Sequence, residues 1–224
     1  MNFVTTSPSP AKIGPNLFDV LKELLLIKPV FLLGIILVTV AILLLFHRNK
    51  SKCTRILVFS VLMYYYLCFM FVNIVGIPSL HEYTRLAQLG ESIFHPNINL
   101  IPFNDGFSFS FLLNILLFIP LGFLCPLISK TFLNKKNICL IGFGLSFFIE
   151  IAQLFTLHRA TDINDLFANV FGTIIGYFFL QLTAKLPIIK SLCSNSPTEK
   201  CTTYLPAIII TISFVLSFLA WNSP

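Results

Sequence analysis

Charged residues are scarce in this chain. They make up 11% of its 224 residues, and only nine of them are acidic. A soluble globular domain carries about a quarter of its residues as charged side chains. The scarcity therefore excludes an ordinary soluble domain and favours a protein that places most of its surface in lipid.

The sequence also lacks the usual motifs of metal and nucleophile chemistry. It contains no HExxH, no GxSxG elbow and no glycine-rich phosphate loop. Its cysteines are scattered without the spacing of a zinc site, and we interpret all of them as ordinary thiols. We therefore expect no metal and no cofactor. The cysteines are Cys53, Cys68, Cys125, Cys139, Cys193 and Cys201.

Long apolar runs dominate what is present. Hydrophobic residues make up 56% of the chain, with 25 Phe, and the mean hydropathy is +0.88. About 20 apolar residues in a helix cross the hydrocarbon core of a bilayer. The sequence therefore predicts an all-α fold, a polytopic transmembrane helical bundle of about six spans. These spans are about Val30–Phe46, Ile56–Ile77, Phe107–Ile128, Ile138–Leu157, Asp165–Leu182 and Tyr204–Trp221.

We divide the chain into four parts by composition. Residues 1–29 form a polar or interfacial segment, and residues 30–55 hold the first span and a basic loop. Residues 56–182 form the main membrane domain, and residues 183–224 hold a loop and the C-terminal span. The longest polar connection, Pro78–Gly106, lies within the main domain.

The basic residues predict the orientation of the bundle. The formal net charge is +6, yet most Lys and Arg residues fall in short loops between spans, so we expect no nucleic acid partner. Ten of the 15 fall on one side, which the positive-inside rule places in the cytoplasm. Both chain ends and the Pro78–Gly106 connection are then outside, and no cysteine falls in an outer loop.

Polar side chains gather where the fourth and fifth predicted spans meet. Ionisable groups within a membrane span cost several kcal/mol, so they often mark a site. Helical rise places Asn114 and Glu150 roughly 10 Å inside the outer ends of their helices, and Asn169 roughly 6–10 Å inside. This common depth predicts one shared, outward-facing polar cavity.

We assign candidate roles within this group by chemistry. Glu150, Asp162 and Asp165 are candidate catalytic acids or bases. Asn114, Gln153, Arg159 and Asn169 are candidate substrate-binding residues. Arg159 is also the natural counter-ion for a buried carboxylate.

Some of these residues have an equally good structural interpretation. Thr161 or Asp162 can cap the fifth helix, and Asp165 falls in its first turn, where a carboxylate meets the positive end of the helix dipole. Gly172 and Gly176 lie four residues apart, and we interpret them as helix-packing positions.

Four motifs occur in a fixed order along the chain. They are NLIPF at Asn99–Phe103, NILLFIPLGFLCPL at Asn114–Leu127, the pair Glu150 and Gln153, and RATDINDLFANVFGTIIGY at Arg159–Tyr177. With these motifs, roughly the region from Ile56 to Leu182 resembles the VanZ-like family, named for a protein associated with resistance to teicoplanin. The resemblance implies a multi-pass protein of the bacterial plasma membrane that is linked to the cell envelope. It also implies that the seven candidate site residues are the family's polar positions.

Three functions remain open from the sequence. The first is an enzyme acting on a lipid-linked envelope component, with Glu150 as acid or base and Arg159 holding an anionic head group. The second is a non-catalytic binder or transporter of an amphiphile, and the third is a structural membrane scaffold. The expected partners are membrane lipids and a lipid-linked envelope precursor or lipoglycopeptide.

Overall fold

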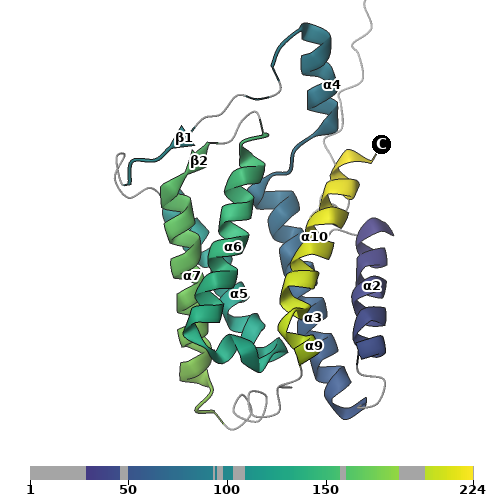
Figure 1. Cartoon of the computed structure of the whole chain (residues 1–224), viewed down its shortest axis with the longest axis vertical. Helices are drawn as coiled ribbons and strands as arrows, with labels where there is room; N and C mark the ends of the chain where they lie inside the picture. The colour runs from purple at the N-terminus through teal and green to yellow at the C-terminus, as the bar shows by residue number, and fades with distance from the viewer. Residues whose placement is uncertain are drawn as a thin grey trace, which may run out of the picture.

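The structure, a computed structural model, describes residues 29–45, 50–92, 94, 98–102, 109–156, 160–186 and 200–223. Within these ranges the chain forms an all-α bundle (Figure 1), as the apolar runs predict. Most of the predicted N-terminal segment lies outside the described residues. The elements are α2 (Pro29–Leu45), α3 (Lys50–Met70), the π-helix η1 (Phe71–Val75), α4 (Leu80–Leu89), β1 (Ile98–Asn99), α5 (Phe109–Ile128), the 3-10 helix η2 (Lys130–Leu133), α6 (Lys135–Gln153), β2 (Thr161–Asp162), α7 (Ile163–Thr183), α9 (Lys200–Thr203) and α10 (Leu205–Asn222).

Five helical segments of the described part are long and apolar enough to cross a membrane. They are Thr54–Leu89, Phe109–Ile128, Lys135–Gln153, Ile163–Thr183 and Leu205–Asn222. The apolar helix α2 is shorter, with 17 residues. Many large apolar side chains on these helices are exposed, among them Leu44, Leu116 and Leu140, as expected for surfaces that face lipid tails. The protein is thus a multi-pass membrane protein.

Glycines bring α5 and α7 into backbone contact. A Cβ atom at Gly176 would lie 2.0 Å from the carbonyl oxygen of Ile119, and one at Gly172 would lie 2.2 Å from that of Ile115. On the facing helix, a Cβ atom at Gly122 would lie 1.9 Å from the carbonyl oxygen of Thr173. The packing role predicted for Gly172 and Gly176 is therefore confirmed. This close contact fixes the polar residues near the starts of α5 and α7 beside each other.

Helix α3 lies between this pair and the helices α2 and α10. Its Tyr64 is fully buried and donates a hydrogen bond to the carbonyl oxygen of Phe31 in α2, at 3.1 Å. Cys68 contacts α10 through the carbonyl oxygen of Ser213, at 4.0 Å. Tyr66 donates to the carbonyl oxygen of Leu117 in α5, at 2.6 Å. These bonds hold α3 in place against three other helices.

Two small strands and a short helix cover one end of the bundle, at the top of Figure 1. Strand β1 pairs in parallel with β2, with Ile98 opposite Thr161 and Asn99 opposite Asp162. This pair links the NLIPF motif to the start of α7. The start of α7 therefore lies next to a segment more than 60 residues away in sequence.

Helix α4 follows η1 after a short non-helical segment, residues 76–79. Ser79 caps its start by accepting a hydrogen bond from the backbone N–H of Glu82, at 3.4 Å, and Gly90 ends it with a φ of 71°. Asn222, at the end of α10, accepts from the backbone N–H of Leu80 at 2.6 Å and donates to the carbonyl oxygen of Pro78 at 3.2 Å. The last turn of α10 thus fixes where α4 begins.

Candidate functional site

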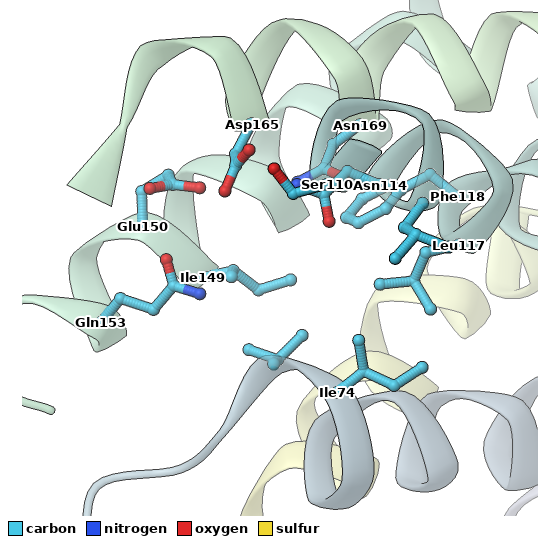
Figure 2. A pocket seen from close by; sticks show the side chains of 12 residues that line it. Ile74, Ser110, Asn114, Leu117, Phe118, Ile149, Glu150, Gln153, Asp165 and Asn169 are labelled. Carbon is cyan, nitrogen blue, oxygen red and sulfur yellow. The ribbon is translucent and has the colours of Figure 1, made fainter. Parts of the chain in front are cut away.

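A cavity of about 160 Å³ lies among η1, α5, α6 and α7 (Figure 2). Its lining comes from the last turns of η1 and α6 and from the first turns of α5 and α7, so it lies at the end of the bundle that carries α4 and the two strands. The lining residues are Ile74, Val75, Ser110, Leu113, Asn114, Leu117, Phe118, Ile149, Glu150, Gln153, Asp165 and Asn169.

The walls of the cavity differ in chemistry. Figure 2 shows Glu150, Asp165 and Asn169 gathered on one side, with Ile74 across the open space from them. The polar wall is completed by Ser110, Asn114 and Gln153, and the apolar wall by side chains of η1 and α5. A cavity of this kind is amphipathic, because one ligand can meet polar groups on one side and hydrocarbon on the other.

Glu150 lies in the last turn of α6 and is buried. Its Oε2 accepts a hydrogen bond from the backbone N–H of Asp162 at 3.1 Å, and its backbone carbonyl accepts from Thr161 Oγ1 at 3.0 Å. These two bonds attach the end of α6 to the start of α7. The Glu150 carboxylate is thereby held in one position at the polar wall.

The depth predicted for Glu150, roughly 10 Å from the end of its helix, is wrong. Helix α6 ends at Gln153, and not near Leu157. The chain turns there because the Thr156 hydroxyl donates to the carbonyl oxygen of Gln153 at 2.8 Å, and the backbone N–H of Leu154 is shared between two carbonyl groups. Glu150 therefore lies within one turn of the helix end.

Asp162 and Asp165 occupy different positions. Asp162 is the N-cap of α7, since its Oδ1 accepts from the backbone N–H of Asn164 at 2.8 Å, while its Oδ2 accepts from Asn99 Nδ2 at 3.4 Å. The predicted capping role is confirmed for Asp162, and Asp165 lies in the first turn as predicted. Only Asp165 of the two is among the lining residues.

Asn169 and Gln153 present buried oxygen atoms at the cavity. The two side chains are 3% and 7% exposed. Asn169 donates through Nδ2 to Ser146 Oγ at 2.9 Å, and its Oδ1 has no hydrogen-bond partner among the described residues. The same holds for Oε1 of Gln153. A buried acceptor without a partner costs about 1–3 kcal/mol, so both oxygens are ready to accept from a ligand.

The structure thus brings five of the seven predicted site residues to one cavity. These are Asn114, Glu150, Gln153, Asp165 and Asn169. Asp162 lies beside them at the helix cap, and Arg159 lies outside the described residues, so its pairing with a carboxylate stays a prediction. In the part of the chain that the structure describes, no group of three or more His, Cys, Asp or Glu could hold a metal ion.

The sequence did not indicate the apolar wall. Ile74 and Val75 belong to the π-helix η1, and nothing in an apolar run distinguishes them from residues that face lipid. π-helical turns occur frequently at functional sites, but they are recognised from backbone geometry. Ser110 did carry a signal, because it is a polar residue one position after the start of an apolar helix.

The family model of VanZ/LLP1 matches residues 56–184, more than half of the chain. The chain belongs to the VanZ/LLP1 family. This confirms the resemblance seen in the sequence. The residues that match VanZ/LLP1 include every residue that lines the cavity, whereas α2 and α10 lie outside the match. No curated protein and no solved structure matches the chain.

Proposed function

We propose that this VanZ/LLP1 protein binds an amphiphilic component of the bacterial cell envelope in the cavity. The head group lies against the polar wall, and the chain leaves along the apolar wall. The observation that supports this is the opposition of two carboxylates and three amides to the apolar residues of η1 and α5. The protein sits in the plasma membrane, with the cavity toward its outer leaflet.

The dimensions of the cavity support binding of a head group rather than of a whole lipid. Its volume of about 160 Å³ is below the roughly 300–1,000 Å³ of pockets that enclose drug-sized ligands. Two apolar lining residues are also exposed at the molecular surface, Leu113 by 47% and Ile74 by 37%. An acyl chain can therefore continue from the cavity onto the lipid-facing surface.

An enzymatic function is the second candidate, supported by two carboxylates in one cavity. Glu150 and Asp165 could act as acid and base toward a bound envelope component, with water as the attacking group. Binding and catalysis differ in the fate of the ligand. A binder releases it intact, whereas an enzyme releases a product of different mass.

The test is a substitution that fills the cavity. Leu113→Trp enlarges a lining side chain, and we expect the lipid that co-purifies with the protein to fall roughly tenfold, because the added ring excludes the head group. Mass spectrometry of lipids extracted from purified protein measures this. The unmodified protein is then incubated with the recovered lipid, and mass spectrometry measures the molecular mass of the lipid afterwards. An unchanged mass indicates binding, and a changed mass indicates catalysis.

Leu112→Trp is the matched control. Leu112 is the preceding residue of α5, is 56% exposed and does not line the cavity. It should keep the lipid content of the unmodified protein. If Leu113→Trp and Leu112→Trp retain the same lipid at equal yield, the cavity binds no amphiphile and the scaffold function stands.

A further inference from the structure

The cavity presents an excess of hydrogen-bond acceptors. Two carboxylates, those of Glu150 and Asp165, line it together with the amide oxygens of Gln153 and Asn169. Among the described residues that line it, none is Lys, Arg or His. The described lining therefore carries only negative formal charge.

The two amide oxygens are buried, and a hydrogen bond fixes the orientation of one of them. The Asn169 amide is oriented by its bond to Ser146 Oγ at 2.9 Å, which leaves Oδ1 as its unpartnered atom. Gln153 Oε1 is likewise unpartnered among the described residues, and Figure 2 shows this oxygen on the side of the amide that faces Glu150. Both residues are more than nine-tenths buried. Such atoms accept hydrogen bonds only from a group that enters the cavity.

We infer that the head group bound here carries a primary ammonium. This inference rests on the proposed function. An ammonium has three N–H donors and no acceptor, which complements two unpartnered amide oxygens beside carboxylates. It also balances the negative charge of the lining, whereas a phosphate in the same place would lie against like charge.

Two related head groups fit less well. A trimethylammonium has the same charge but no N–H group, so it leaves the oxygens of Gln153 and Asn169 without a donor. A glycerol head group has hydroxyl donors but no positive charge to pair with the Glu150 carboxylate. The ammonium is the group that satisfies both the oxygens and the charge.

The experiment compares three phospholipids with identical acyl chains. Purified protein in detergent is mixed with equal amounts of phosphatidylethanolamine, phosphatidylcholine and phosphatidylglycerol, and native mass spectrometry counts the adducts. We expect phosphatidylethanolamine to exceed each of the others by at least about tenfold, because sites built to bond a donor reject analogues that lack it. The double variant Glu150→Gln, Asp165→Asn should reduce the preference over phosphatidylglycerol to about threefold or less. The preference over phosphatidylcholine, which depends on the oxygens of Gln153 and Asn169, should remain.

The variant Leu113→Trp, which fills the cavity, separates failure of the ammonium inference from failure of the proposed function. If Leu113→Trp removes bound lipid but the unmodified protein shows no preference, or prefers phosphatidylglycerol, the ammonium inference is overturned and the lipid cavity stands. If Leu113→Trp removes no lipid relative to Leu112→Trp, the proposed function itself fails. A preference over phosphatidylglycerol that is undiminished in the double carboxamide variant would also overturn the inference.

Discussion

The hydrogen bond that holds the Glu150 side chain comes from a backbone N–H group. A substitution can therefore remove the negative charge of this residue and keep the bond. Its carboxylate accepts from the backbone N–H of Asp162 at 3.1 Å, a bond that the amide oxygen of Gln can also accept. Glu150→Gln therefore keeps the connection between α6 and α7 and removes only the negative charge. Its effect on function reports what the charge does.

We predict that Glu150→Gln abolishes function while the protein still accumulates in the membrane. If the side chain served only as interhelical contact, Gln would replace it within about 1 kcal/mol. The loss is expected because the charge balances a cationic head group or transfers a proton. The readout that the family suggests is teicoplanin susceptibility of bacteria that express each variant, once the unmodified protein is seen to change it.

Glu82→Gln provides the matched control for this substitution. Glu82 lies in the first turn of α4 and does not line the cavity, so removing its charge should leave susceptibility unchanged. Equal activity of Glu150→Gln and the unmodified protein, at equal membrane abundance, would end the site hypothesis for this residue.

Much of the polar wall could be predicted from the sequence, for a physical reason. A polar side chain such as Asn114 or Asn169 stands out in an apolar helix because lipid penalises it. Ile74 and Leu117 could not be found in this way. An apolar residue in an apolar helix looks the same in the sequence whether its side chain faces lipid or a cavity. Only the packing of four segments distinguishes the two.

At the scale of elements, the contact between α5 and α7 determines the shape of the site. Both helices contribute lining residues from their first three turns, and their backbones touch further along at Gly172 and Gly176. A change in the spacing of these helices would therefore move Asn114 relative to Asn169.

We predict that Gly176→Ala destabilises the bundle by about 1–3 kcal/mol, because the added Cβ would overlap the carbonyl oxygen of Ile119 in backbone that cannot move freely. Gly144→Ala in α6 is the matched control, since nothing lies within 4 Å of its added Cβ. This control should be neutral or stabilising by up to about 1 kcal/mol, as Ala favours helix. Thermal unfolding in detergent measures both variants.

Equal thermal stability of Gly176→Ala and Gly144→Ala would contradict the close packing of α5 against α7. It would mean that α5 and α7 can separate without cost. The comparison is informative because both variants add one methyl group to a helical glycine, and only the surroundings of that group differ.

The elements differ in how far the sequence predicts them. The long helices follow from apolar length alone, but α4 was predicted as part of a polar connection. Its signals were present, since Ser79 and Glu82 have the spacing of a capping box and Gly90 is a helix terminator. The strands β1 and β2 have two residues each, too few for a periodic pattern, and their pairing depends on contacts distant in sequence.

At the scale of the whole molecule, the two ends of the bundle differ in charge. Four described lysines lie at the end opposite the cavity: Lys130 at the start of η2, Lys135 and Lys136 at the start of α6, and Lys185 after the end of α7. The positive-inside rule predicts that this end faces the cytoplasm and that the cavity faces outward. The fold itself carries no such information, because the same bundle fits a bilayer in either direction.

We predict that single cysteines introduced at the two ends react differently in intact cells. Glu91→Cys, after α4, should be labelled by a membrane-impermeant thiol reagent, whereas Lys136→Cys should be labelled only after the cells are opened. Both positions are exposed, so accessibility in the folded protein does not separate them. The unmodified protein is the background, since none of its cysteines falls in a predicted outer loop. Labelling of Lys136→Cys alone in intact cells would reverse the orientation.

The apolar wall of the cavity depends on the number of residues in the π-helix η1, which directly follows α3. A π-turn holds about one residue more than a turn of α-helix, because its hydrogen bonds run from i to i+5 instead of from i to i+4. A descendant that lost one residue between Phe71 and Val75 would return this turn to α-helical geometry, and the helix on either side would keep nearly the same orientation. The change would fall on the part of the apolar wall that η1 supplies through Ile74 and Val75. A single-residue deletion here could therefore change ligand preference in one evolutionary step, without any substitution among the polar residues.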